Sequence, residues 1–122
     1  MLDILVVEDD VILGCLIRDT VVEAGHSVNV VQTVKSARDH ILSKPCDAVL
    51  LDLNLNGERG QDLIALLRDA GADIPPVVIL SAQGEEAIAE AAQEIGAVAT
   101  IEKPCTVAAI TEAVSELSAR AR

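Results

Sequence analysis

Acidic residues follow two apolar runs of this 122-residue chain at the points where the runs end. Glu8, Asp9 and Asp10 follow one run, and Asp52 directly follows another that is rich in Val and Leu. Short runs of this kind are typical of buried parallel strands, whose carboxyl ends border the ligand-binding crevice of open α/β proteins. Each acid alone could simply cap a turn or start a helix, so the question is what else converges on the same edge.

A hydroxyl and an ammonium group also follow apolar runs. Ser81 ends the run at residues 77–80, and Lys103 comes just after the run at residues 97–101. Taken alone, Ser81 could be a cap and Lys103 a surface base. Because all strands of a parallel sheet point the same way, we expect both side chains to reach the edge that carries the acids.

Clustered carboxylates need a cation, since two of them about 4 Å apart repel by roughly 4 kcal/mol at an effective dielectric near 20. Mg²⁺ prefers oxygen ligands and keeps several waters, so it suits such a cluster, and Lys103 would add a fixed positive charge. A metal ion and a lysine around one carboxylate favour phosphoryl transfer. Asp52 would be the nucleophile that forms an acyl phosphate, and Ser81 could donate a hydrogen bond to a phosphoryl oxygen.

The elements that must position these residues alternate along the chain. Short apolar runs predict strands at residues 4–7, 28–31, 48–51, 77–80 and 97–101. Apolar residues at helical spacing predict helices at residues 13–24, 34–42, 63–70, 85–95 and 107–117. Five β-α units of this kind specify an α/β fold, with a parallel sheet, helices on both faces and right-handed crossovers.

The composition is that of one globular domain covering residues 1–122, with an aliphatic core because the chain has no Phe, Tyr or Trp. The formal charge of −11 disfavours direct binding to nucleic acid or to an anionic membrane. No apolar run approaches the roughly 18 residues of a membrane span, and the N-terminus lacks the pattern of a signal peptide.

The three cysteines, Cys15, Cys46 and Cys105, show no C-x-x-C spacing. We therefore expect reduced thiols packed as small hydrophobes in a cytoplasmic protein, and no zinc site.

The motifs together resemble the receiver domain of two-component response regulators. The resemblance rests on Glu8-Asp9-Asp10 after the first apolar run, on Asp52-Leu53-Asn54-Leu55, on Ser81-Ala82 and on Lys103-Pro104. Five separated positions match in type, order and spacing, and the match covers nearly the whole chain. It implies a doubly wound (βα)5, flavodoxin-like sandwich of three layers, whose five-stranded parallel sheet has the order 2-1-3-4-5.

The resemblance also implies how the site works. Asp52 would accept a phosphoryl group from a histidine of a sensor kinase or of a histidine phosphotransfer protein. The family's Mg²⁺ ligands fall on Asp9, on Asp52 and on the main-chain carbonyl of Asn54, with Glu8 acting mostly through water. Such a domain catalyses only its own phosphorylation and dephosphorylation and is otherwise no enzyme.

Lys103 and Ser81 take the family's charge-pairing and switch positions. The Lys103-Pro104 peptide is often cis in the family, which aims the lysine inward. Receiver domains usually carry Tyr or Phe three residues before the lysine, where this chain has Thr100. Rotation of an aromatic ring therefore cannot be the output signal, and we expect activation to be transmitted through the loop after Ser81 and the helix at residues 85–95.

Two further positions bear on the loop beside Asp52. Asn56 stands where the family commonly has Pro, and Asn56-Gly57 favours a turn with positive φ. Asn54 and Gln83 flank the path by which water would attack an acyl phosphate. They either set its lifetime or are ordinary solvated loop residues.

Several functions fit this pattern. The leading hypothesis is a phosphorylatable signalling module that acts through contact with a downstream protein, or serves as a phosphate relay or sink, either alone or as a part of a larger hybrid kinase. The alternative is a Mg²⁺-dependent phosphohydrolase with Asp52 as a nucleophile that turns over. Against it, the chain leaves no segment for a substrate cap, and Asn54 stands where the best-known aspartate phosphatases have a second aspartate. A third reading, a docking domain without phosphorylation, conflicts with the intact acid, Ser and Lys set.

Overall fold

Five parallel strands form the central sheet of the computed structural model, which describes residues 1–120. They are β1 (Asp3–Val7), β2 (Ser27–Val31), β3 (Ala48–Asp52), β6 (Val77–Ser81) and β7 (Ala99–Glu102). Their spatial order is β2-β1-β3-β6-β7, which confirms the expected order 2-1-3-4-5 when these strands are counted along the chain. Ala121 and Arg122, the last residues of the expected domain, lie outside the described residues.

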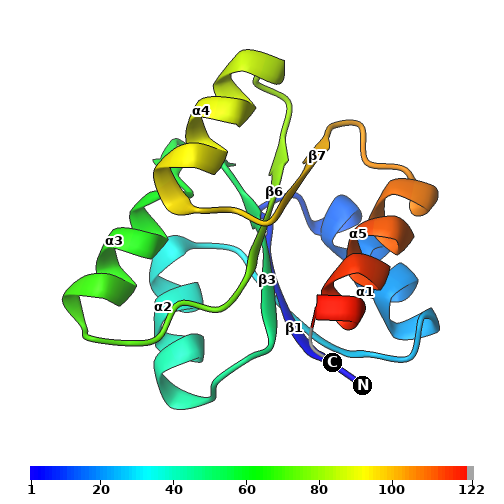
Figure 1. Ribbon diagram of the computed structural model, residues 1–122, viewed down its shortest axis with the longest axis horizontal. Helices are drawn as coiled ribbons and strands as arrows, with labels where there is room; N and C mark the ends of the chain where they lie inside the picture. Colours follow the sequence, from blue (N-terminus) through cyan, green and yellow to red (C-terminus); the bar gives the residue numbers. More distant parts are fainter. Residues whose placement is uncertain (121–122) are drawn as a thin grey trace.

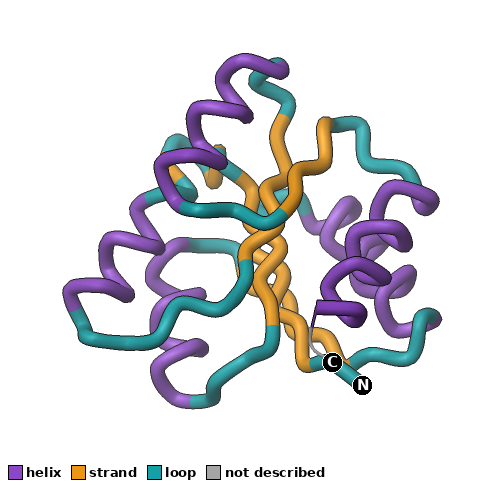
Figure 2. The backbone as a smooth tube through the Cα atoms, in the orientation of Figure 1, coloured by secondary structure: helices purple, strands orange, loops and turns teal. Residues whose placement is uncertain are grey.

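Helices cover both faces of this sheet, as the alternation of elements predicts (Figure 1). They are α1 (Val11–Glu23), α2 (Val34–Ser43), α3 (Asp62–Asp69), α4 (Glu85–Ile95) and α5 (Val107–Arg120). Helices α1 and α5 lie on one side, and α2, α3 and α4 on the other, with the sheet seen edge-on between them in Figure 2.

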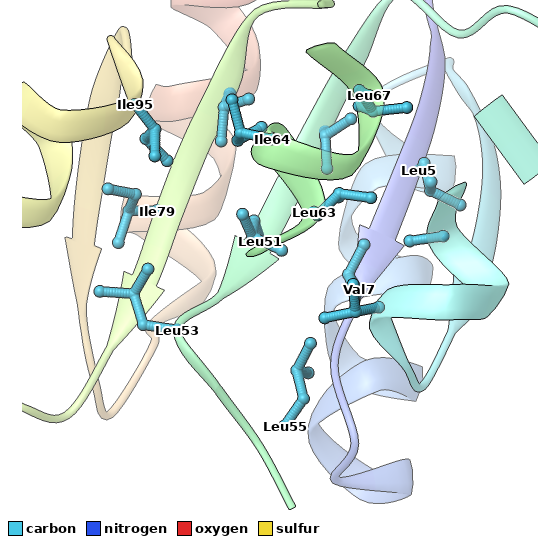
Figure 3. Close-up of a cluster of buried hydrophobic side chains, with 14 of the residues drawn as sticks. Leu5, Val7, Leu51, Leu53, Leu55, Leu63, Ile64, Leu67, Ile79 and Ile95 are labelled. Atoms are coloured by element: carbon cyan, nitrogen blue, oxygen red, sulfur yellow. The ribbon is translucent and has the colours of Figure 1, made fainter. Parts of the chain in front are cut away.

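Each layer of the core is aliphatic and follows the alternation of the strands. Leu5 and Val7 of β1 belong to the cluster on the side of α2, α3 and α4, whereas Ile4 and Val6 belong to the cluster on the side of α1 and α5. Burial on both faces explains why these strands read as continuous apolar runs rather than as alternating ones. Figure 3 shows the larger cluster, with Leu53 at the carboxyl ends of the strands.

A small antiparallel hairpin follows β3, where the sequence indicated a loop. It consists of β4 (Asn54–Leu55) and β5 (Glu58–Arg59), joined by Asn56 and Gly57. Both turn residues have positive φ, 53° and 89°, as expected for Asn-Gly and as a type I′ turn requires. The strands of two residues each are too short for a hydrophobic pattern, so the Asn-Gly pair was the available signal.

The cysteines are free, and two of them are held as neutral thiols. Burial raises the pKa of Cys46 to about 11 and also raises that of Cys105. Both findings agree with packing as small hydrophobes. None of the helices within residues 1–120 has the length and apolar character needed to span a lipid bilayer.

Candidate functional site

An open pocket of about 490 Å³ lies at the carboxyl edge of the sheet. It contains all six residues that sequence reasoning selected for the site. Its lining consists of Glu8, Asp9, Asp10, Asp52, Asn54, Ser81, Ala82, Gln83 and Lys103. The residues come from the ends of β1, β3, β6 and β7, because parallel strands deliver their carboxyl ends to one edge.

Lys103 is the central charge of this pocket. Its Nζ lies 2.8 Å from Glu8 Oε1 and 2.9 Å from Asp52 Oδ2. The side chain of Glu8 is fully buried, and that of Asp52 is only 4% exposed. The Lys103-Pro104 peptide is cis, as the resemblance implied. One ammonium group thus forms ion pairs with two buried carboxylates.

Main-chain N–H groups hold the remaining carboxylate oxygens. Asn54 N–H donates to Asp52 Oδ1 and Asp10 N–H donates to Glu8 Oε2, both at 3.1 Å. Within the described part of the chain, Glu8 Oε1 is paired through its 2.8 Å contact with Lys103 Nζ and accepts no main-chain hydrogen bond.

Burial and charge pull the pKa values of the site in opposite directions. Burial raises the pKa of Glu8 to about 7, a rise that Lys103 opposes and Asp52 reinforces. Burial also lowers the pKa of Lys103, but Glu8 and Asp52 raise it by more, so its pKa is raised overall. Lys103 is therefore a permanent cation, whereas Glu8 is poised to exchange a proton near neutrality.

Three carboxylates of the site could hold a metal ion together. Glu8, Asp9 and Asp52 each offer an oxygen, and these atoms lie within 4.8 Å of one another. The group carries more negative charge than Lys103 neutralises, and it leaves Glu8 Oε1 without a hydrogen bond. An all-oxygen donor set with excess negative charge fits a hard divalent cation such as Mg²⁺.

Other polar residues of the pocket have local structural tasks. Asp10 caps α1, since its Oδ1 accepts hydrogen bonds from the N–H groups of Ile12 and Leu13 at 3.0 and 3.1 Å. Ser81 Oγ accepts a hydrogen bond from Gln83 N–H at 3.0 Å. The hydroxyl proton of Ser81 is therefore not used in this contact and can be donated to a ligand.

Two residues near Asp52 were missed as parts of the site by sequence reasoning. Gly60 packs so closely that a Cβ there would collide with the main-chain carbonyl oxygen of Asp52. Asn56 N–H donates a hydrogen bond of 3.0 Å to Asp9 Oδ2 across 47 positions of sequence. A lone glycine between a hairpin and a helix was a weak signal for the first, and no local pattern signals the second.

Comparison with known proteins agrees with this geometry. The family described as "Response regulator receiver domain" matches residues 4–115. The chain belongs to this family. Solved receiver domains have the same fold: that of the Francisella response regulator 1452 is 25% identical, with a TM-score of 0.87 and full coverage of both chains. The receiver domain of NtrX from Brucella abortus is 28% identical, with a TM-score of 0.83 and coverage of 94% of this chain and 97% of that one.

Curated relatives of this receiver domain are longer proteins. The sensory/regulatory protein RpfC of Xanthomonas campestris pv. campestris is 31% identical over 82% of this chain and 14% of its own length. The regulatory protein VirG of Agrobacterium fabrum is 34% identical over 83% of this chain and 40% of its own length. The chain thus spans less than half of these relatives. As a receiver domain of two-component response regulators, it is a signalling module of the kind that is phosphorylated on an aspartate.

Proposed function

We propose that Asp52 is the phosphoacceptor of this receiver domain and that residues 1–122 act as one such domain. The observation that carries the proposal is the Lys103 ammonium, held 2.9 Å from Asp52 Oδ2 and 2.8 Å from Glu8 Oε1. The ammonium lies where it can pair with the carboxylate nucleophile and with the charge of an incoming phosphoryl group.

The donor would be a phosphohistidine on a sensor histidine kinase or on a histidine phosphotransfer protein. A carboxylate oxygen of Asp52 forms the new O–P bond while the P–N bond to the imidazole breaks. The imidazole leaves with the electron pair of that bond and takes up a proton. Lys103 then pairs with the phosphoryl oxygens, and the Ser81 hydroxyl donates to one of them.

Mg²⁺ would be held by Asp9, by Asp52 and by the main-chain carbonyl of Asn54, with Glu8 acting through water. Bound there, the metal would neutralise the charge on the phosphoryl oxygens. The close approach of Gly60 to Asp52 would keep the backbone of the ligand loop in place.

Ser81 also suggests how phosphorylation is transmitted in a chain with no aromatic residue. Its Oγ accepts a hydrogen bond from the N–H of Gln83, and Gly84, with a φ of 95°, is the N-cap residue of α4. A Ser81 hydroxyl that turns toward a phosphoryl group would change this bond and so move the loop before α4. Thr100, exposed on β7, supplies no ring to report the change.

A downstream protein, rather than DNA or a membrane, would then recognise the altered loop and α4. The charge of −11 supports this choice of partner, and reduced cysteines support a cytoplasmic location.

The test is incubation with Mg²⁺ and either acetyl phosphate or phosphoramidate, followed by mass spectrometry of the intact protein. We expect one phosphoryl group per chain, lost in Asp52→Asn and retained in Asp47→Asn, which alters an exposed acid at the opposite edge of the sheet. Repeated turnover of phosphate esters without a stoichiometric adduct would instead favour the phosphohydrolase.

The transmission route has its own readout in NMR spectra of the protein with and without a phosphoryl mimic. We expect the largest shifts between Ser81 and the end of α4. Unchanged resonances in this segment would rule the route out.

A further inference from the structure

The turn at Asn56 and Gly57 contacts Asp9, one residue of the candidate metal site. Its main-chain N–H at Asn56 donates to Asp9 Oδ2 at 3.0 Å. A hydrogen bond to an ionised oxygen is roughly twice as strong as one between neutral groups. Asp9 is only partly buried, so this bond restricts a side chain that water could otherwise leave free to rotate.

The β4–β5 hairpin, which carries this donor, is anchored to the core through the buried side chain of Leu55. Leu55 is 1% exposed and belongs to the apolar cluster beneath α2 and α3, where it is drawn in Figure 3. Gly57 N–H donates to Asn54 Oδ1 at 3.1 Å, which braces the turn from within. The φ of 53° at Asn56 suits Asn or Gly and excludes Pro, whose ring fixes φ near −65°.

We propose that the β4–β5 hairpin is a positioning element for the metal ligand Asp9. The Asn56 N–H holds Oδ2 and so limits the orientations in which Asp9 would offer a carboxylate oxygen to a cation beside Glu8 and Asp52. This inference rests on the proposed function, because it assumes that Asp9 binds Mg²⁺. Partners that orient metal ligands typically contribute 10- to 100-fold to metal affinity.

The donor is a main-chain group, so the side chain of Asn56 is not what the site needs. It needs a residue that has an N–H and tolerates positive φ. A proline, which the family commonly has here, would supply neither, so this hydrogen bond depends on the Asn-Gly turn of this chain.

The experiment measures Mg²⁺ affinity by isothermal titration calorimetry, with far-UV circular dichroism as the check on folding. We expect Asn56→Pro to bind Mg²⁺ about 10- to 100-fold more weakly than the wild type. Asn56→Gly keeps the N–H and the positive φ, so it is expected to restore most of the affinity. In an Asp9→Ala background, Asn56→Pro should add little further loss, because the ligand that it orients is gone.

A second readout does not depend on metal. The amide proton of Asn56 should resonate downfield in the free protein and move upfield in Asp9→Ala. The inference would be overturned if wild type and Asn56→Pro bind Mg²⁺ with equal affinity, or if Asn56→Pro loses as much Mg²⁺ affinity in the Asp9→Ala background as in the wild type. It would also be overturned if the Asn56 amide resonance does not move in Asp9→Ala. If wild type binds no Mg²⁺ while the Asp52 adduct still forms, the positioning role fails but the phosphoacceptor stands.

Discussion

The two edges of the central sheet carry similar side chains in different arrangements. At the amino edge, Asp3 begins β1, Asp47 precedes β3, and the Lys44 Nζ lies 3.4 Å from Asp3 Oδ2. At the carboxyl edge, Lys103 lies against two acids, Glu8 and Asp52. Both edges therefore combine carboxylates with one lysine, yet only the carboxyl edge forms the candidate site.

The two edges differ in how far the lysine and its acids are exposed, whereas a buried carboxylate oxygen without a hydrogen bond within residues 1–120 occurs at both, Asp3 Oδ1 and Glu8 Oε1. Asp47 Oδ2 accepts a hydrogen bond from Asp3 N–H at 2.7 Å, so it closes the backbone at the start of the sheet, and the Lys44 side chain is 65% exposed. Lys103 is 20% exposed, and its two partners are almost fully buried. Acids near a lysine therefore do not by themselves indicate a functional site. Charged side chains that are buried, at a cost in desolvation energy, do indicate one.

Removing each lysine should give the largest contrast between the edges. Lys103→Met leaves Glu8 and Asp52 buried without a counter-charge, so we expect it to lower the free energy of unfolding by about 3 to 5 kcal/mol. Lys44→Met removes a lysine whose side chain is 65% exposed and should cost less than about 1 kcal/mol. Urea unfolding followed by far-UV circular dichroism measures both, in metal-free buffer at neutral pH.

Mg²⁺ provides the control for this pair of variants. It should stabilise Lys103→Met more than Lys44→Met, because a bound cation replaces the missing charge beside Glu8 and Asp52. Equal losses of stability for the two lysines would mean that burial does not distinguish the two edges.

A pH series should expose the raised pKa of Glu8. Between about 4.5, its usual pKa, and about 7, the folded protein keeps a proton on Glu8 that the unfolded chain has lost. Stability from this group is therefore present below about 4.5 and is lost as the pH rises through about 7. The free energy of unfolding of the wild type should fall relative to Glu8→Gln over this range, by roughly 3 kcal/mol at most.

The measurement is the difference between the two unfolding curves in metal-free buffer at a series of pH values. Saturating Mg²⁺ should flatten the series, because a bound cation keeps the carboxylates of the site ionised. A wild type that gains stability relative to Glu8→Gln as the pH rises would contradict the assigned direction of the shift.

Most of the fold could be predicted from the sequence, because both of its signals are local. Buried parallel strands give short apolar runs, and amphipathic helices give a period near 3.6 residues. Errors occurred where a cap or a bond decides the boundary. Helix α1 begins at Val11, earlier than expected, because the Asp10 side chain caps it. The last strand begins at Ala99 rather than Ala97, because Ala97 N–H still bonds to Ala92 O at the end of α4.

The principal residues of the candidate site could also be predicted, because strand ends of a parallel sheet meet by topology. The hairpin contacts could not. The bond from Asn56 N–H to Asp9 depends on the orientation of a main-chain group at a turn, and neither residue type encodes it. The tight approach of Gly60 to Asp52 likewise appears only when the backbone is folded.

The smallest expected effect concerns two ion pairs whose basic side chains are exposed, Arg59–Glu94 and Lys44–Asp3. Arg59 of the hairpin lies 3.3 Å from Glu94 Oε2 of α4, and Lys44 lies 3.4 Å from Asp3. Double-mutant cycles with Arg59→Gln and Glu94→Gln, and with Lys44→Gln and Asp3→Asn, should each give a coupling energy below about 1 kcal/mol that weakens with salt.

The coupling energies of the two ion pairs should respond differently when Mg²⁺ and a phosphoryl mimic bind to the site. Arg59 belongs to the β4–β5 hairpin, whose turn donates a hydrogen bond to Asp9, and Glu94 belongs to α4, which we expect to move on phosphorylation. The Arg59–Glu94 coupling energy should therefore change when Mg²⁺ and a phosphoryl mimic are added. The Lys44–Asp3 pair shares no contact with the site and should keep its value. The same cycles repeated in the loaded state test this directly. If both pairs respond alike, the hairpin is no mechanical link between the site and α4, and Ser81 and its loop would be the route that is left.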